Sequence, residues 1–195
     1  GSRADMGVSA VANDALVGDV TGFVGASYRL SGKPSSGLTV NDDDNLSDVV
    51  ASLGINPEMP FKFNWSGRLA SSDFELNESR TTVSGKVRKL GYTVEHVQMA
   101  KPYFQSAASD LEEMKLSLSY DLPGGWTASG IQIWDLSNGK TRRDTSTAAL
   151  KWTGGIQNCL TISLDYDRDV QSDRDISSTD QFMLTVNFKY CLLYT

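Results

Sequence analysis

The C-terminal part of the chain, from Cys159 to Leu193, reads as two strands joined by an acidic loop. Apolar and polar residues alternate for about ten residues in each strand, which is the period of a β-strand with two different faces. The apolar residues are Leu160, Ile162, Leu164 and Tyr166, followed by Phe182, Leu184, Val186, Phe188 and Tyr190. A strand of a membrane-spanning barrel has this length and pattern. A half-buried strand of a soluble antiparallel sheet can show the same alternation, so the number of strands and their connections must decide.

The composition limits the classes of function open to the chain. Its 195 residues are 39% apolar and carry a net charge of -6. An apolar core or a lipid-facing band is therefore available, and the chain is not disordered by composition. The acidic balance argues against nucleic-acid binding, which normally uses a basic face. The sequence has no run of about 18 apolar residues, so it contains no membrane-spanning helix.

The same alternation recurs along the whole chain. It predicts an all-β, antiparallel, up-and-down meander of about 10–12 strands, with no helical segment. Besides the last two strands, the expected strands cover residues 17–30, 48–55, 59–69, 74–87, 92–101, 111–121, 126–135 and 148–152, with a weaker one at 6–11. The apolar parity of segment 74–87 shifts between Leu76 and Val83, so its faces are poorly defined.

The predicted connections alternate between short turns and longer loops. Short turns fall at Asn56-Pro57, Lys89–Gly91, Pro123–Gly125 and Gly154-Gly155, and longer polar loops at 31–47, 102–110, 136–145 and 170–180. The short break at Ser71–Asp73 is the exception. Outer-membrane barrels are connected in this way, with short periplasmic turns and longer extracellular loops. We therefore expect residues 1–195 to form a single transmembrane β-barrel domain or a barrel fragment, with no separate periplasmic domain.

Two segments resemble a known family. The stretch GGIQNCLTISLDYDRDVQSDRDISSTDQFMLTVNFK, from Gly154 to Lys189, is similar to the C-terminal end of the lipopolysaccharide-assembly outer-membrane proteins, the LptD family. The family's cysteine and its two Arg-Asp pairs correspond to Cys159, Arg168-Asp169 and Arg174-Asp175. Upstream, FNWSGRLASSDFELNESRTTVSGKVRKLGYTVEHVQM resembles the family's Tyr-rich strand, Asp-Phe corner and following hairpin.

The resemblance implies a bacterial outer-membrane protein that inserts lipopolysaccharide into the outer leaflet, without catalysis and without a cofactor. The implied partners are lipopolysaccharide, an LptE-like plug lipoprotein, a periplasmic bridge protein and membrane lipids. The chain is too short for the family's whole barrel, so another chain that completes the barrel is a further expected partner. The tail, Tyr190–Thr195, departs from the usual barrel-assembly signal because it lacks a terminal aromatic residue.

Cys159 and Cys191 are the disulfide candidates. In the family, the C-terminal cysteine bonds to cysteines of an N-terminal region that is absent from this sequence. Within this chain, each cysteine is sixteen residues from Asp175 and shares the polar parity of its strand. The two can therefore face each other across the hairpin in an oxidising compartment. An internal bond, a bond to another chain and free thiols all stay open.

Charged residues supply the remaining site candidates. Five basic residues alternate with the apolar residues of their strands: Lys62, Arg68, Lys115, Lys151 and Lys189. They could bind phosphate groups of lipopolysaccharide, or they could line a hydrated lumen wall. His96 is the only histidine and shares the apolar parity of Tyr92 and Val94, so we expect it to be packed or interfacial and not catalytic. We expect no metal site, because the acidic run Asp42–Asp44 does not have EF-hand spacing.

Three functions follow from these patterns. The first is a β-barrel component of the lipopolysaccharide translocon. The second is a small closed outer-membrane barrel that acts as a passive pore or adhesin. The third is a soluble β-sandwich binding module.

Overall fold

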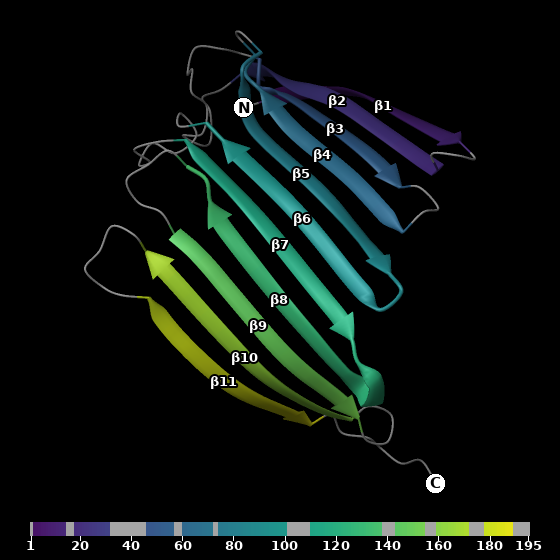
Figure 1. Cartoon of the computed structure of the whole chain (residues 1–195). Coiled ribbons are helices and arrows are strands. Elements are labelled where there is room, and N and C mark those ends of the chain that lie inside the picture. Colours follow the sequence, from purple (N-terminus) through teal and green to yellow (C-terminus); the bar gives the residue numbers. More distant parts are fainter. Residues whose placement is uncertain are drawn as a thin grey trace. The chain divides into compact units, whose positions relative to one another are not determined.

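The computed structural model describes residues 2–14, 18–31, 46–56, 60–71, 74–100, 110–137, 143–154, 159–171 and 178–188. Eleven strands follow one another in a single sheet, in sequential order from β1 to β11 (Figure 1). The predicted all-β, antiparallel, up-and-down meander is therefore confirmed. The strands are β1 (Ser2–Asp14), β2 (Gly18–Ser31), β3 (Val49–Asn56), β4 (Phe61–Leu69), β5 (Leu76–Val87), β6 (Leu90–Met99), β7 (Leu111–Asp121), β8 (Trp126–Asp135), β9 (Arg143–Gly154), β10 (Leu160–Gln171) and β11 (Thr179–Phe188).

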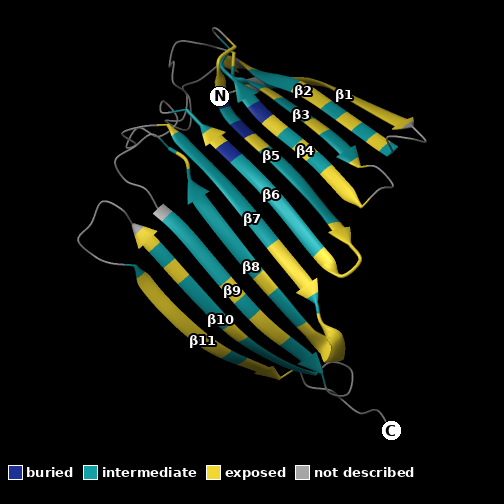
Figure 2. Cartoon of the chain, viewed as in Figure 1, coloured by how far each residue is buried: buried dark blue, intermediate teal, exposed yellow. Residues whose placement is uncertain are grey.

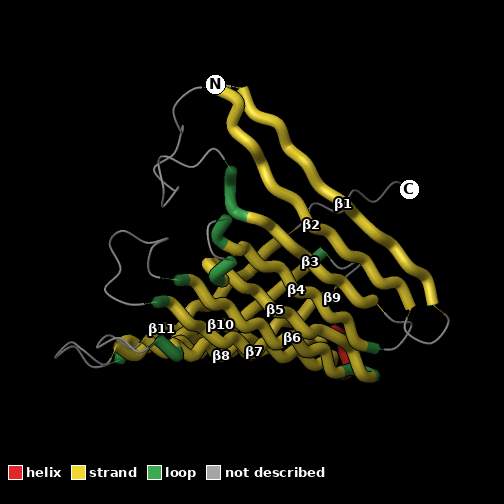
Figure 3. Tube along the Cα trace, turned by 90° about the horizontal axis from the view of Figure 1, so that it is seen from above, coloured by secondary structure: helices red, strands yellow, loops and turns green. Residues whose placement is uncertain are grey.

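Strand is the dominant structure in the described part of the chain, as Figure 3 shows. One 3-10 turn, η2 (Pro123–Gly125), joins β7 to β8. Two of its residues, Gly124 and Gly125, have left-handed φ angles of 76° and 81°, which glycine adopts without a steric cost. The sequence Pro-Gly-Gly therefore explains why the chain reverses here.

The connections alternate in length along the chain. Residues 15–17, 57–60, 88–89, 122–125 and 155–159 form connections of two to five residues. Residues 32–48, 70–75, 100–110, 136–142 and 172–178 form connections of six to seventeen residues and alternate with the first set. The apparent exception at Ser71–Asp73 belongs to the connection 70–75, so it follows the same alternation.

The chain divides into two compact units. The first contains Gly1–Ser84, Glu95–Glu113 and Leu136–Gly139, and the second contains Gly85–Val94, Met114–Asp135 and Lys140–Thr195. We describe each unit separately.

The sheet of the first unit has one apolar and one mainly polar face. Neighbouring residues on β1 to β4 form rows across the sheet, because strand pairs fix which residues lie opposite each other. Two rows of the apolar face are Ala12, Val20, Ile55 and Phe63, and Ala10, Gly22, Leu53 and Trp65. On the opposite face, Val11, Thr21, Gly54 and Asn64 form one row, and Ser9, Phe23, Ser52 and Ser66 form the next.

The second unit separates its faces more completely. Its apolar face contains the rows Trp126, Trp152, Ile162 and Val186, then Ala128, Leu150, Leu164 and Leu184, then Gly130, Ala148, Tyr166 and Phe182. The opposite face contains the rows Thr127, Lys151, Ser163 and Thr185, then Ser129, Ala149, Asp165 and Met183. The two faces predicted for the last hairpin are therefore confirmed.

No apolar core of ordinary size exists in the described residues. Val97, at 9% exposure, is the single buried hydrophobic side chain among them. In contrast, Leu184 and Phe188 are 68% and 77% exposed, and Figure 2 shows exposed positions along nearly all of β11. An apolar face of this size in water would be unusual for a monomeric soluble protein.

Several strand boundaries differ from those predicted. The strand expected at 6–11 extends over Ser2–Asp14, and the one expected at 148–152 extends over Arg143–Gly154. The turn expected at Lys89–Gly91 lies instead at Arg88–Lys89, with Gly91 inside β6. Arg88 has a left-handed φ of 55°, a conformation that non-glycine residues adopt only uncommonly.

Candidate functional site

The polar face of the first unit contains an open pocket of about 230 Å³. Its polar lining is made of hydroxyl, amide and guanidinium groups, and it comes from β2, β3, β4 and β5. The residues are Thr21, Ser52, Leu53, Gly54, Asn64, Trp65, Ser66, Arg80 and Thr82. Seven of these residues share the polar-face parity of their strands, because every second residue points to the same side, whereas Leu53 and Trp65 belong to a row of the apolar face. The pocket is suited to water or to a small polar group.

Basic side chains of the described chain form ion pairs with carboxylates of neighbouring strands. Arg68 Nε lies 3.8 Å from Glu78 Oε2, and Arg80 Nη1 lies 3.3 Å from Glu95 Oε1. In the second unit, Lys86 Nζ lies 2.7 Å from Asp121 Oδ2. These side chains are partly or largely exposed, so water screens the pairs and each contributes little to stability. Their effect is to balance charge on the polar face.

The basic candidates from the sequence are spread along the sheet. Lys62 and Arg68 lie on β4, about 20 Å apart along the strand. Lys115 and Lys151 lie on β7 and β9, with β8 between them. Lys189 lies outside the described residues. Lys151 has Thr127 and Ser163 opposite it on the two neighbouring strands.

Acidic residues accompany Lys151 on the same face. Asp165, Asp167 and Asp169 alternate along β10, and the hydroxyl of Ser163 donates a hydrogen bond to Asp165 Oδ2 at 3.0 Å. No role was predicted for Asp165 and Asp167, although their alternation is visible in the sequence. They make this face mixed in charge, so it differs from a uniformly basic phosphate-binding surface.

Two tryptophans of the apolar face form hydrogen bonds through their indole N–H groups. In the second unit, the rings of Trp126 and Trp152 lie 6.4 Å apart, and Trp152 Nε1 donates a hydrogen bond to the Gly124 carbonyl oxygen at 2.9 Å. In the first unit, Trp65 Nε1 donates to Ser79 Oγ at 3.1 Å. Because these indole N–H groups have partners, the rings can lie against an apolar medium at low cost.

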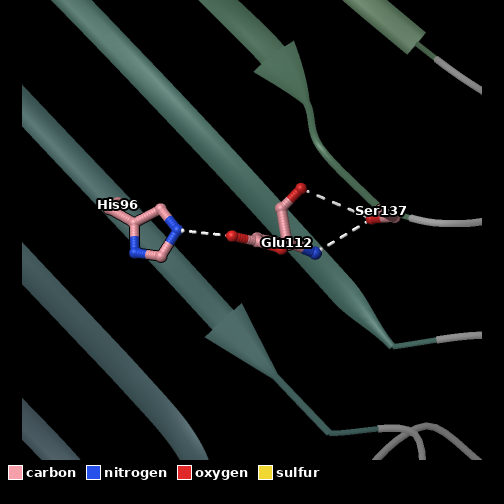
Figure 4. A network of polar contacts seen from close by, with 3 residues as sticks. All are labelled: His96, Glu112 and Ser137. Atoms are coloured by element: carbon pink, nitrogen blue, oxygen red, sulfur yellow. Dashed lines mark hydrogen bonds and ion pairs between the residues drawn. The ribbon is translucent and has the colours of Figure 1, made fainter.

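The only histidine belongs to a polar network in the first unit (Figure 4). His96 Nε2 lies 3.0 Å from Glu112 Oε1. Ser137 Oγ accepts a hydrogen bond from the Glu112 backbone N–H at 2.9 Å and lies 3.4 Å from the Glu112 carbonyl oxygen. In a hydrolase triad the hydroxyl of the nucleophile is hydrogen-bonded to the imidazole. The Ser137 hydroxyl instead contacts the backbone of Glu112. The network therefore holds β7 to the segment after β8.

The family-motif residues are only partly described. Arg168 and Asp169 lie near the end of β10, where Arg168 Nε is 3.9 Å from Asp180 Oδ1 on β11. Tyr166 donates a hydrogen bond to the same carboxylate oxygen at 2.8 Å. Arg174 and Asp175 lie outside the described residues. Cys159 lies just before β10 and Cys191 also lies outside, so the disulfide stays a prediction.

Two features are absent from the described residues. They contain no group of three or more His, Cys, Asp or Glu side chains arranged to hold a metal ion. They also include no helix that is both long and apolar enough to cross a membrane. The acidic run Asp42–Asp44 falls in a segment that the structure does not describe.

Comparisons of the chain with protein-family models, with curated proteins and with solved structures found no match. The two faces of the sheet and the sequence therefore carry the proposed function.

Proposed function

We propose that the chain is a segment of a transmembrane β-barrel in the bacterial outer membrane, and that this barrel transports lipopolysaccharide to the outer leaflet. The observation that carries the membrane location is the exposed apolar face of a single sheet. Along β10 and β11 this face bears Leu164 and Leu184, which are 49% and 68% exposed. Contact with hydrocarbon would remove such side chains from water, at about 25 cal/mol per Å² of buried apolar surface.

The strand lengths and connections support the same location. Nine of the eleven strands have nine to thirteen residues, and a tilted barrel strand needs about 9–11 to cross the hydrocarbon layer. The regular alternation of short and long connections fits the wiring of outer-membrane barrels. A soluble sandwich needs two sheets packed face to face, whereas the described strands belong to one sheet.

The transport role rests on the sequence resemblance and on the chemistry of Lys151. The Lys151 ammonium, which has Thr127 and Ser163 opposite it, offers N–H donors to a phosphate oxygen, whereas the Ser163 hydroxyl already donates to Asp165. This arrangement favours an anionic, hydroxyl-rich cargo. A passive pore is the second candidate, because a face of hydroxyls and balanced charges would also line a hydrated channel.

Photo-crosslinking in intact cells tests the transport role. We place a photoreactive amino acid at Thr185, which shares the Lys151 row, and expect it to crosslink to lipopolysaccharide. Lys151→Glu should lower the yield of this adduct about tenfold, because a charge-assisted hydrogen bond contributes about 1.5–3 kcal/mol. Lys151→Arg, which keeps the charge, should retain most of it.

Two results would count against this proposal in different ways. An adduct that persists unchanged in Lys151→Glu would remove Lys151 as a phosphate contact. Absence of lipopolysaccharide adducts from all polar-face positions, together with ion conductance in planar bilayers, would favour the passive pore.

A further inference from the structure

The polar pocket of the first unit is built around a glycine. Gly54 on β3 lies opposite Thr21 on β2 and opposite Asn64 on β4, in one row of the polar face. A Cβ at Gly54 would lie 2.6 Å from Thr21 Oγ1 and 3.3 Å from Asn64 Oδ1. The two side-chain oxygens therefore approach the same point above the glycine, and only the lack of a side chain at Gly54 leaves room for them.

The uncharged polar side chains around this glycine are available to a ligand. Five of them line the pocket: Thr21, Ser52, Asn64, Ser66 and Thr82. Within the described part of the chain, no hydrogen bond engages any of these five side chains. Each hydroxyl offers one donor and two acceptor lone pairs, and the Asn64 amide offers two donors and an acceptor oxygen. The pocket therefore presents both donors and acceptors to whatever enters it.

The charge of the pocket is close to balanced. Arg80 belongs to the lining, and its Nη1 lies 3.3 Å from Glu95 Oε1. The other N–H groups of this guanidinium can donate to a ligand oxygen. An anionic ligand would meet the Glu95 carboxylate beside Arg80, and a divalent cation would meet the guanidinium without a carboxylate in the lining. Charge therefore favours a neutral ligand that carries several hydroxyl groups.

The size of the pocket limits the ligand to one small ring. Its volume of about 230 Å³ lies below the range of about 300–1,000 Å³ that is usual for drug-sized ligands. Because the pocket is open, the rest of a longer molecule can stay in solvent. Phe23 lies opposite Ser52 on the same face, but its ring covers Gly7 and Gly25, where an added Cβ would lie 2.7 and 2.6 Å from ring atoms. Recognition therefore depends on hydrogen bonds.

We propose that this pocket binds a single neutral sugar ring. The ring hydroxyls, each both donor and acceptor, bind Thr21, Asn64 and the free N–H groups of Arg80. The ring is either a free saccharide or a sugar unit of lipopolysaccharide, because both present the same hydroxyl groups. The inference does not rest on the transport role, since the pocket belongs to the first unit and Lys151 to the second.

Saturation-transfer NMR on the full chain tests the proposal. The protein is placed in phospholipid nanodiscs prepared without glycoside detergents, which would occupy a sugar site. We expect transfer to the ring protons of at least one of methyl glucoside, methyl galactoside and methyl mannoside. Cyclohexanol, a six-membered ring with one hydroxyl, and methyl glucuronide, whose carboxylate meets Glu95, should bind about fivefold more weakly or less.

Two variants alter the pocket and one serves as the matched control. Gly54→Ala forces the Thr21 hydroxyl to rotate away, and Asn64→Leu removes the amide at nearly constant size. Each should raise the Kd for the bound glycoside about fivefold or more, the effect of one lost hydrogen bond. Gly22→Ala adds the same methyl to the apolar face, where a Cβ meets nothing within 4 Å, and should leave the Kd unchanged.

A photoreactive amino acid at Ser84, the next polar-face position after Thr82 on β5, identifies the source of the sugar in intact cells. An adduct with lipopolysaccharide would support the site with a cargo sugar as its ligand. Glycoside binding in nanodiscs without this adduct would support it with a free saccharide.

Three results would overturn the proposal: no saturation transfer to any neutral glycoside, tighter binding of methyl glucuronide than of the neutral glycosides, or equal Kd values for Gly54→Ala and Gly22→Ala. None of them would affect the crosslinking expected near Lys151.

Discussion

Replacing Leu164 with arginine should destabilise the membrane-inserted protein by about 2–4 kcal/mol, the cost of a charge near the middle of the lipid-facing side of a barrel strand. Leu164 lies in the middle of the apolar face of the second unit. It pairs with Leu150 on β9 and with Leu184 on β11. Its side chain is already 49% exposed, so in water an arginine would be accommodated with little loss. Urea unfolding in phospholipid vesicles measures the difference.

Thr161→Arg is the matched control for this variant. Thr161 lies on the same strand, pairs with Thr153 and Asn187, and belongs to the polar face. Its replacement by arginine should change the free energy of unfolding by less than about 1 kcal/mol. Equal costs for the two variants would contradict a lipid-facing apolar side.

Gly125→Ala should strongly destabilise the second unit, because it combines backbone strain with a clash against a backbone carbonyl. Gly125 has a φ of 81°, so any Cβ there costs about 1–2 kcal/mol. The added Cβ would also overlap the Thr153 carbonyl oxygen on β9, and such overpacking costs about 1–3 kcal/mol more. We expect a total loss of about 2–5 kcal/mol in the free energy of unfolding, measured by urea unfolding in vesicles.

Alanine substitutions at two other glycines of the second unit separate the backbone cost from the steric cost. Gly124 has a φ of 76°, but a Cβ there would meet only a Trp126 ring atom at 3.8 Å, so Gly124→Ala should show the backbone cost alone. A Cβ at Gly130 would lie 3.6 Å from the Thr147 carbonyl oxygen, an ordinary contact, so Gly130→Ala should be close to neutral. Identical losses for Gly124→Ala and Gly125→Ala would show that the Thr153 carbonyl plays no part.

Strand order and faces could be predicted where the side chains differ strongly in polarity. The final hairpin is the clearest case for the two faces, because large apolar residues alternate with hydroxyl and carboxylate residues. Its register differs from the one centred on Asp175, which would place Leu164 opposite Val186, because the structure pairs Leu164 with Leu184. β1 was predicted too short because its face contains alanines and glycine, whose small side chains give a weak alternation signal. The turn before β6 was predicted at Lys89–Gly91, but it lies at Arg88–Lys89, where Arg88 has a left-handed φ.

The candidate site was less predictable, because its contacts join strands whose register is set by the whole sheet. Sequence parity could place Arg68 on the polar face, but not its pairing with Glu78 on β5, where the alternation shifts. The sequence also did not predict that Gln132, Ser146, Arg168 and Asp180 lie in one row, because these residues align only once four strands are paired. The roles proposed for Cys191 and Lys189 stay predictions outside the described residues.

The central claim is that one face of this sheet contacts lipid and the other contacts water. A nitroxide scan of residues 160–167 on β10, in the vesicle-inserted protein, tests it most directly. Even-numbered positions should collide mainly with membrane-soluble oxygen and odd-numbered positions with a water-soluble nickel chelate, with a period of two residues. High accessibility of both faces to the nickel chelate would contradict the membrane location, and low accessibility of the even-numbered positions to both reagents would show that protein covers the apolar face.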